Sequence, residues 1–147
     1  MSVFAIPAGV GVASGIAIYG VKKYVTNAKR AEAQNVLRAL TSGMATCAAR
    51  GDLPETSQWV PADLSDVAGK KYPSSASDWS AQPAFSCSGF ALAEPQYFRY
   101  RWQRTSEHSG QFEAEADLNA DGVADNRMQQ GVECTAGKCA VQSLTSP

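Results

Sequence analysis

The feature that most constrains this chain is an apolar run close to its N-terminus. No charged residue occurs from Val3 to Val21, and Lys22 and Lys23 end the run. Its nineteen residues fall within the range of about 17–25 that a helix needs to span a bilayer. A secretory signal peptide is the less favoured alternative, because no basic segment precedes the run. We therefore expect residues 1–23 to form an apolar stem helix that lies in a membrane or in the core of an assembly.

Small residues distinguish this stem from a simple membrane anchor. Gly11 and Gly15 have the spacing that lets two helices approach closely, whereas Pro7 favours a kink. The stem is therefore expected to pack against other helices and to be interrupted or loosened near its glycines. The apolar side chains expected to make the assembly contacts are Met1, Val3, Phe4, Ile6, Val10, Val12, Ile16 and Ile18.

A helical pattern continues beyond the two lysines. Apolar residues recur at mostly four-residue spacing, as in Val36, Leu40 and Met44, with polar residues between them. Gly51 and Pro54 then provide a stop signal. The sequence predicts one long helix that ends at about residue 49. Its amphipathic half, residues 24–50, is expected to pack on a head formed by residues 51–147.

The first part of the head lacks a periodic pattern. Residues 52–95 contain five prolines and scattered aromatic residues. We expect this segment to be an ordered loop region. Its aromatic side chains should pack against the helix and hold the segment there.

The next part of the head carries the clearest strand signal. Polar and apolar residues alternate over 96–104 and again over 111–117, with a polar turn between. The pair predicts a hairpin in which Arg99 and Arg101 lie opposite Glu113 and Glu115. This pairing is favoured over binding of an acidic ligand on the Arg/Tyr face.

A third strand is expected around residues 127–134, so the sheet should have three or four antiparallel strands. The predicted fold class is α+β, with a long N-terminal α-helix and a small antiparallel sheet.

Four cysteines, Cys47, Cys87, Cys134 and Cys139, allow three disulfide pairings. We favour Cys47–Cys87, which would join the loop region to the helix, and Cys134–Cys139, which would close a small loop. A zinc site is the alternative, but the chain has no Cys-x-x-Cys pair. Disulfides would place the protein in an oxidising compartment, and hence outside the cytoplasm.

An acidic segment, Asp117–Asp125, matches the first nine positions of the EF-hand calcium loop. The twelfth position is Met128 instead of the usual bidentate glutamate, for which Glu133 or Asp63 could substitute. The alternative interpretation is a solvated Asp/Gly turn. The expected ligands of a structural Ca²⁺ are Asp117, Asn119, Asp121, the carbonyl of Val123, and Asp125.

Composition excludes other classes of function. Thirteen basic and fourteen acidic residues give a net charge of −1, whereas a nucleic-acid-binding protein usually has a basic excess. His108, the single histidine, falls in a polar turn. The sequence also lacks a phosphate-binding glycine loop and a Gly-x-Ser-x-Gly motif. It therefore does not predict an enzyme.

Several segments together carry a family resemblance. In Ala17–Ala33 an apolar helix ends, a tyrosine follows, and a basic segment reaches a Glu-Ala pair. In the head, Ser77–Trp79, Glu94–Tyr100, Gln111–Ala114 and Asp117–Gly122 resemble the heads of pilin-like proteins from δ-proteobacterial relatives. The chain thus resembles the type IV pilins and pseudopilins over most of its length.

The resemblance implies a helical homopolymer in which apolar stems form the core and sheet-bearing heads face outward. It implies a leader removed by a prepilin peptidase, methylation of the new N-terminus, and assembly by pilus machinery in the inner membrane. The subunit would lie in that membrane first and in a cell-surface filament afterwards. Cys134–Cys139 resembles the disulfide loop near a pilin C-terminus, and the missing basic leader fits a mature chain that begins at Met1.

The chain also departs from the pilin pattern. Ala5 stands where pilins carry a glutamate, and an alignment on Tyr24 places Ser2 there. The first acid of the chain is Glu32. Subunit register would therefore rest on apolar packing and on the charges of residues 22–30. A structural filament subunit is the leading hypothesis. The alternatives are a minor pilin or secretion pseudopilin, and a membrane-anchored exported binding domain.

Overall fold

The computed structural model describes the backbone of residues 10–146 and the side chains of residues 25–146. Its longest element is helix α1, Val10–Ala48, which ends just before Gly51 as predicted. The expected interruption at the stem glycines is wrong for this range, because α1 continues through Gly11, Gly15 and Gly20. A single glycine costs a helix only about 1 kcal/mol relative to alanine, so isolated glycines do not break it.

A four-stranded antiparallel sheet forms the second layer, and its strands follow one another in chain order. The hairpin prediction is confirmed, including its register, since Arg99 pairs with Glu115 and Arg101 with Glu113. The fold is therefore α+β. The strands are β1 (Arg99–Arg104), β2 (Ser109–Ala116), β3 (Asn126–Thr135) and β4 (Lys138–Val141).

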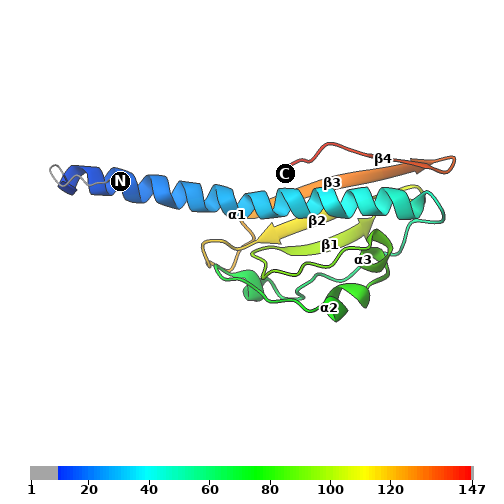
Figure 1. Cartoon of the computed structure of the whole chain (residues 1–147), viewed down its shortest axis with the longest axis horizontal. Coiled ribbons are helices and arrows are strands. Elements are labelled where there is room, and N and C mark those ends of the chain that lie inside the picture. The colour runs from blue at the N-terminus through cyan, green and yellow to red at the C-terminus, as the bar shows by residue number, and fades with distance from the viewer. Residues whose placement is uncertain (1–9, 147) are drawn as a thin grey trace.

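The main core lies between the C-terminal part of α1 and one face of this sheet (Figure 1). Helix α1 contributes apolar residues spaced three or four apart, and alternate residues of each strand face them. Burial of each large side chain contributes about 1.5–3 kcal/mol. The fully or almost fully buried core residues include Ala33, Leu37, Leu40 and Met44 of α1, and Tyr100, Trp102, Phe112, Ala114, Met128 and Val132 of the sheet.

The connection from α1 to β1 contains three short helices: η1 (Leu64–Val67), α2 (Ala76–Ser80) and α3 (Pro83–Ser88). Trp79 and Phe85 are fully buried and pack edge to face, with ring centroids 4.9 Å apart. Helix α3 packs so closely on α1 that a Cβ at Gly43 would collide with the carbonyl oxygen of Ser88. The prediction that aromatic residues hold this region on the helix is confirmed for Phe85, which is buried on α3, the short helix that packs on α1. Trp79 of α2 packs on Phe85 and on Tyr100 of the sheet.

Part of the same connection extends the sheet, which the sequence did not predict. The Val60 amide donates to the Tyr100 carbonyl at 2.9 Å, and the Tyr100 amide donates back at 3.0 Å. The Ser57 amide likewise donates to the Trp102 carbonyl. Residues 56–60 thus cover the outer edge of β1, which protects an otherwise open strand edge from pairing with other chains.

The N-terminal part of α1 extends beyond the sheet (Figure 1). No helix within residues 10–146 is both long enough and apolar enough to cross a bilayer. The predicted run 3–21 begins outside this range. So do four of the predicted assembly residues, Met1, Val3, Phe4 and Ile6. The others, Val10, Val12, Ile16 and Ile18, lie on the part of α1 whose side chains are not described.

Both disulfides follow the pairing that the sequence favours. Cys47 of α1 is bonded to Cys87 of α3, at a sequence separation of 40. Cys134 is bonded to Cys139, its direct partner across the β3–β4 turn, at a separation of 5. One bond therefore closes a long loop and the other a short one.

This difference predicts unequal contributions to stability, because a longer closed loop removes more entropy from the unfolded chain. Replacing Cys47 and Cys87 by serine should cost about 4 kcal/mol of unfolding free energy, whereas replacing Cys134 and Cys139 should cost about 2 kcal/mol. Urea unfolding of the two double variants measures both values. A larger loss in the Cys134/Cys139 variant would contradict this ranking.

Candidate functional site

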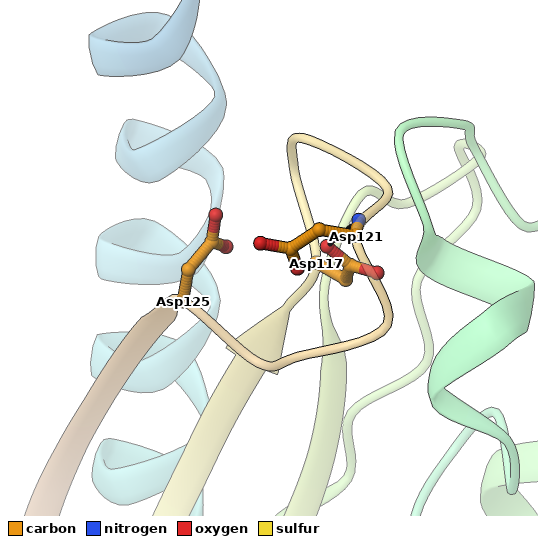
Figure 2. Close-up of side chains that lie close together, drawn as sticks. All are labelled: Asp117, Asp121 and Asp125. Carbon is orange, nitrogen blue, oxygen red and sulfur yellow. Dashed lines mark hydrogen bonds between the residues drawn. The ribbon is translucent and has the colours of Figure 1, made fainter.

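Three acidic side chains meet in the loop between β2 and β3. Asp117 follows β2 directly, Asp121 lies at the tip of the loop, and Asp125 precedes β3. Figure 2 shows the three side chains directed toward one another. One carboxylate oxygen from each lies within 4.8 Å of the others. The loop thus concentrates three negative charges at the end of the sheet from which α1 extends.

Backbone amides of the loop hold these carboxylates in place. The buried Asp117 side chain accepts hydrogen bonds from the amides of Asp121, at 3.0 Å, and Gly122, at 2.7 Å. Asp121 accepts from the Val123 amide, and Asp125 accepts from the Leu118 amide. Gly122 has a φ of 89°, a left-handed conformation that glycine adopts without a steric penalty. The sequence therefore builds the convergence locally.

This arrangement suits a hard cation such as Ca²⁺, which binds oxygen ligands at about 2.3–2.6 Å. Oxygens that share one such ion lie no more than about 5.2 Å apart, and the three carboxylates meet this limit. The exposed Asn119 and Val123 lie in the same loop, outside the three-carboxylate group. Further ligands would come from these two residues or from water.

The ligands suggested for the twelfth position of the calcium loop do not fit. Glu133 lies far along β3 from Asn126, about 23 Å away at the rise of an extended strand. It cannot reach the loop. Asp63 is likewise absent from the carboxylate group found within residues 25–146. Met128 occupies the twelfth position and is buried in the core.

A second polar site joins α1 to the start of β1, and sequence analysis did not identify it. The Glu32 carboxylate accepts the Tyr97 amide at 2.9 Å, the Phe98 amide at 3.3 Å and the Tyr100 hydroxyl at 2.8 Å. Glu32 is thus the acceptor for three donors of the head. Glu32 lies directly before the buried Ala33, at the border of the apolar stripe of α1. This position in the sequence could have indicated that Glu32 is partly buried and needs hydrogen-bond donors.

Burial governs the electrostatics of this site. It raises the pKa of Glu32 above its ordinary value of 4.5, although the three hydrogen bonds and the positive charge of Lys71 act in the opposite direction. Burial and the adjacent Glu32 carboxylate together raise the pKa of Tyr100 well above its ordinary value. Tyr100 therefore keeps its proton and remains a donor to Glu32 at neutral pH.

The basic residues beside Glu32 are engaged within the chain. The Lys29 ammonium lies 4.6 Å from the centroid of the Tyr97 ring. Arg30 donates to Asn126 at 2.7 Å and to Ser146 at 3.1 Å. These two side chains hold α1 on the segment before β1, on the start of β3 and on the C-terminal segment. Lys29 and Arg30 belong to the charged segment 22–30 that was predicted to set subunit register. Both already have partners within the head of the same chain.

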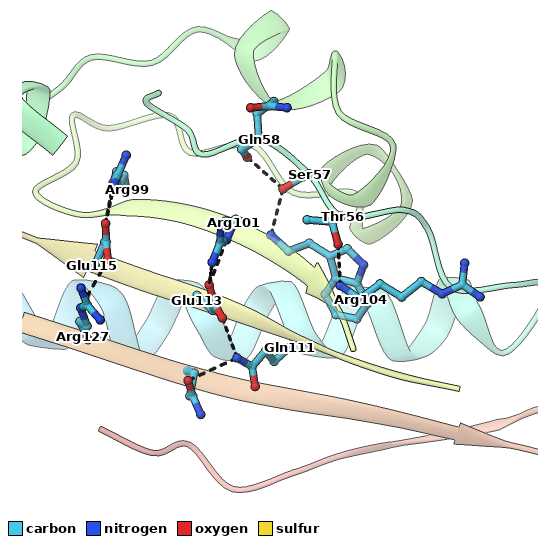
Figure 3. A network of polar contacts seen from close by, with 12 residues as sticks. Thr56, Ser57, Gln58, Arg99, Arg101, Arg104, Gln111, Glu113, Glu115 and Arg127 are labelled. Atoms are coloured by element: carbon cyan, nitrogen blue, oxygen red, sulfur yellow. Dashed lines mark hydrogen bonds and ion pairs between the residues drawn. The ribbon is translucent and has the colours of Figure 1, made fainter. Parts of the chain in front are cut away.

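The outer face of the sheet carries a ladder of ion pairs (Figure 3). Arg99 pairs with Glu115, Arg101 pairs with Glu113, and Arg127 lies 3.5 Å from Glu115. The Trp59 ring packs on Arg99 and Arg101, whose guanidinium carbons lie 4.4 and 4.5 Å from its centroid. The prediction that these arginines pair with the neighbouring strand is confirmed. Trp59 thus packs on the sheet instead of on α1.

Comparisons with known proteins add no family assignment. No family model matches the chain, and no curated protein or solved structure shows significant similarity to it.

The raised pKa of Glu32 predicts a pH dependence of stability. The folded state binds the proton of Glu32 more tightly than the unfolded state does. Protonation of Glu32 therefore stabilises the fold, and this contribution is complete below the unfolded pKa of 4.5. It is lost as the pH rises through the higher folded pKa. The wild-type chain should therefore lose unfolding free energy relative to Glu32→Gln as the pH rises above about 4.5.

Thermal unfolding of the two proteins across this pH range measures the difference. Glu94→Gln, which changes an exposed loop acid, is the matched control. A difference between wild type and Glu32→Gln that stays constant with pH, or that grows in favour of the wild type, would contradict the assignment.

Proposed function

We propose that the chain is a subunit of an extracellular helical filament of the type IV pilus kind, assembled by packing of its N-terminal helices. The observation that carries the proposal is the division of α1 into two parts. From Lys29 onward its residues contact the head. The fifteen residues Val10–Tyr24 continue the helix by about 22 Å, and Figure 1 draws them beyond the sheet.

The sequence of this extension supports self-association. Residues 10–21 contain no charge, and glycine occupies three of their positions. Small residues allow helices to approach closely, and a monomer in water would have to expose a large apolar surface. Burying such a helix among its neighbours yields on the order of 20 kcal/mol before the costs of association. A contact between different faces of identical subunits produces a helical filament when the rotation between neighbours does not close into a ring.

The head supports export and an outward position. One disulfide joins α1 to α3 and the other closes the β3–β4 turn, and such bonds form in oxidising compartments. The edge of β1 is covered by residues 56–60, which disfavours growth by strand addition. The helix extension, whose residues 10–21 carry no charge, is the apolar surface on which the proposed association rests.

A charged residue introduced into the N-terminal extension of α1 should block assembly. Lysine or glutamate at Val12 or Ile16 would bury an unpaired charge among apolar helices, at a cost of several kcal/mol per subunit. Cells that make these variants should yield no sheared surface fibres by negative-stain microscopy. Near-ultraviolet circular dichroism of the detergent-solubilised chain should show an unchanged head.

Asn35→Lys is the matched control, since Asn35 is an exposed residue of the same helix, and it should assemble. Mass spectrometry of the fibres measures the share of this chain and separates a principal subunit from a minor one. Fibres formed normally by Val12→Lys or Ile16→Lys, or a wild-type chain found only as a detergent-soluble monomer, would contradict the proposal.

We also propose that the β2–β3 loop binds a structural Ca²⁺ through Asp117, Asp121 and Asp125. The supporting observation is the convergence of the three carboxylates within 4.8 Å. An ion there would offset their mutual repulsion and fix the loop between β2 and β3. Asn119 and the Val123 carbonyl are the proposed additional ligands.

Calcium should therefore stabilise the folded chain, by about 2.7 kcal/mol when its concentration is one hundred times the dissociation constant. Melting temperatures with calcium and with a chelator measure the effect. Asp121→Asn keeps an acceptor for the Val123 amide but removes a charge, so it should reduce the shift. Glu107→Gln, in the exposed β1–β2 turn, should leave it unchanged. A wild-type melt that calcium does not move would contradict calcium binding.

A further inference from the structure

A pocket of about 400 Å³ lies on the outer face of the sheet, beside the ion-pair ladder. Its floor is formed where Ala114 of β2 and Met128 of β3 pair directly, and their side chains turn into the core. The floor is therefore backbone. The walls come from Trp59, Arg101, Glu113, Glu115, Arg127 and Gln129. The volume lies within the usual range of small-molecule sites, about 300–1,000 Å³.

The walls combine one aromatic surface with polar groups that the fold holds in place. Arg101 donates to Glu113 through Nε at 3.0 Å, and Gln111 donates to the other carboxylate oxygen of Glu113 at 2.6 Å. The Trp59 ring packs on both Arg99 and Arg101. A ligand would therefore meet side chains that are already ordered, which reduces the entropy cost of binding.

Hydrogen-bonding capacity remains on these walls. Arg127 is 60% exposed and reaches Glu115 at 3.5 Å. Among the hydrogen bonds of residues 25–146, none uses the Arg127 guanidinium or the side-chain amide nitrogen of Gln129. The carboxylates of Glu113 and Glu115 can each accept further bonds. Donors and acceptors thus border the pocket together.

The charge of the pocket restricts the class of ligand. Two arginines and two glutamates line it, so their formal charges cancel, and their pairing reduces the gain that a charged ligand could obtain. The class of ligand that suits this lining is a neutral molecule with many hydroxyl groups and an apolar face. Planar carboxylates, guanidinium groups and amides suit vicinal hydroxyls, while the C–H face of a pyranose ring can pack on indole.

We propose that this pocket binds a neutral saccharide, with the indole of Trp59, which lines the pocket, in contact with the sugar and with Arg127, Gln129 and Glu113 bonding its hydroxyls. This activity is independent of filament formation, since every residue of the pocket belongs to the head.

Intact protein in lauryldimethylamine oxide, a detergent without a sugar headgroup, allows the test. The probes are methyl β-glucopyranoside, methyl β-galactopyranoside and methyl α-mannopyranoside, with the methyl glycoside of N-acetylneuraminic acid as the anionic probe. Saturation-transfer NMR detects binding. Tryptophan fluorescence reports on Trp59 in particular, because Trp79 and Trp102 are fully buried.

At least one neutral methyl hexoside should bind and change the tryptophan emission. Trp59→Leu should weaken binding about tenfold, and Arg127→Gln, which removes no intramolecular hydrogen bond, should weaken it severalfold. Tyr97→Leu and Arg104→Gln lie outside the pocket and serve as controls that should retain binding. Absence of binding to every neutral probe, binding of the anionic probe alone, or equal binding by wild type, Trp59→Leu and Arg127→Gln would each overturn the proposal.

Discussion

The contact between the C-terminal half of α1 and the inner face of the sheet is the interaction on which the rest of the structure depends. Leu37, Leu40 and Met44 are fully buried there, and Glu32 accepts three donors from the start of β1. The Cys47–Cys87 disulfide secures the far end of the helix. Because α1 is continuous from Val10 to Ala48, fixing this half also sets the direction in which the N-terminal half leaves the head.

The distribution of charge separates surfaces that serve the fold from surfaces left for partners. On the outer sheet face, arginines and glutamates pair with one another, and Lys29 and Arg30 contact the head of the same chain. Strong ionic attraction between subunits is therefore not expected from these groups. The uncharged sequence of residues 10–21 makes apolar packing the main source of association in the proposed filament. The convergent carboxylates of the β2–β3 loop are a separate feature, suited to a cation.

Local patterns in the sequence predicted much of the fold. Alternation and opposite charges placed β1 against β2 in the correct register, and four-residue spacing with Gly51 and Pro54 located the end of α1. The loop carboxylates converge as expected because their spacing is built into nine consecutive residues. Features that depend on distant segments were missed. Glu32 acquires its role from backbone amides 65 and 66 residues away, and residues 56–60 extend the sheet only because β1 presents an open edge. The expectation that the stem glycines interrupt the helix was wrong, because α1 continues through Gly11, Gly15 and Gly20.

The central claim is that the apolar extension of α1 is an assembly surface for copies of the same chain. A helical reconstruction by electron cryomicroscopy, from fibres sheared off cells that make this protein, tests it most directly. The account predicts repeating density in which the extensions pack around the filament axis and the disulfide-bonded heads lie outside. Fibres whose axis is formed by a different protein, with this chain absent or attached through its head, would contradict the account.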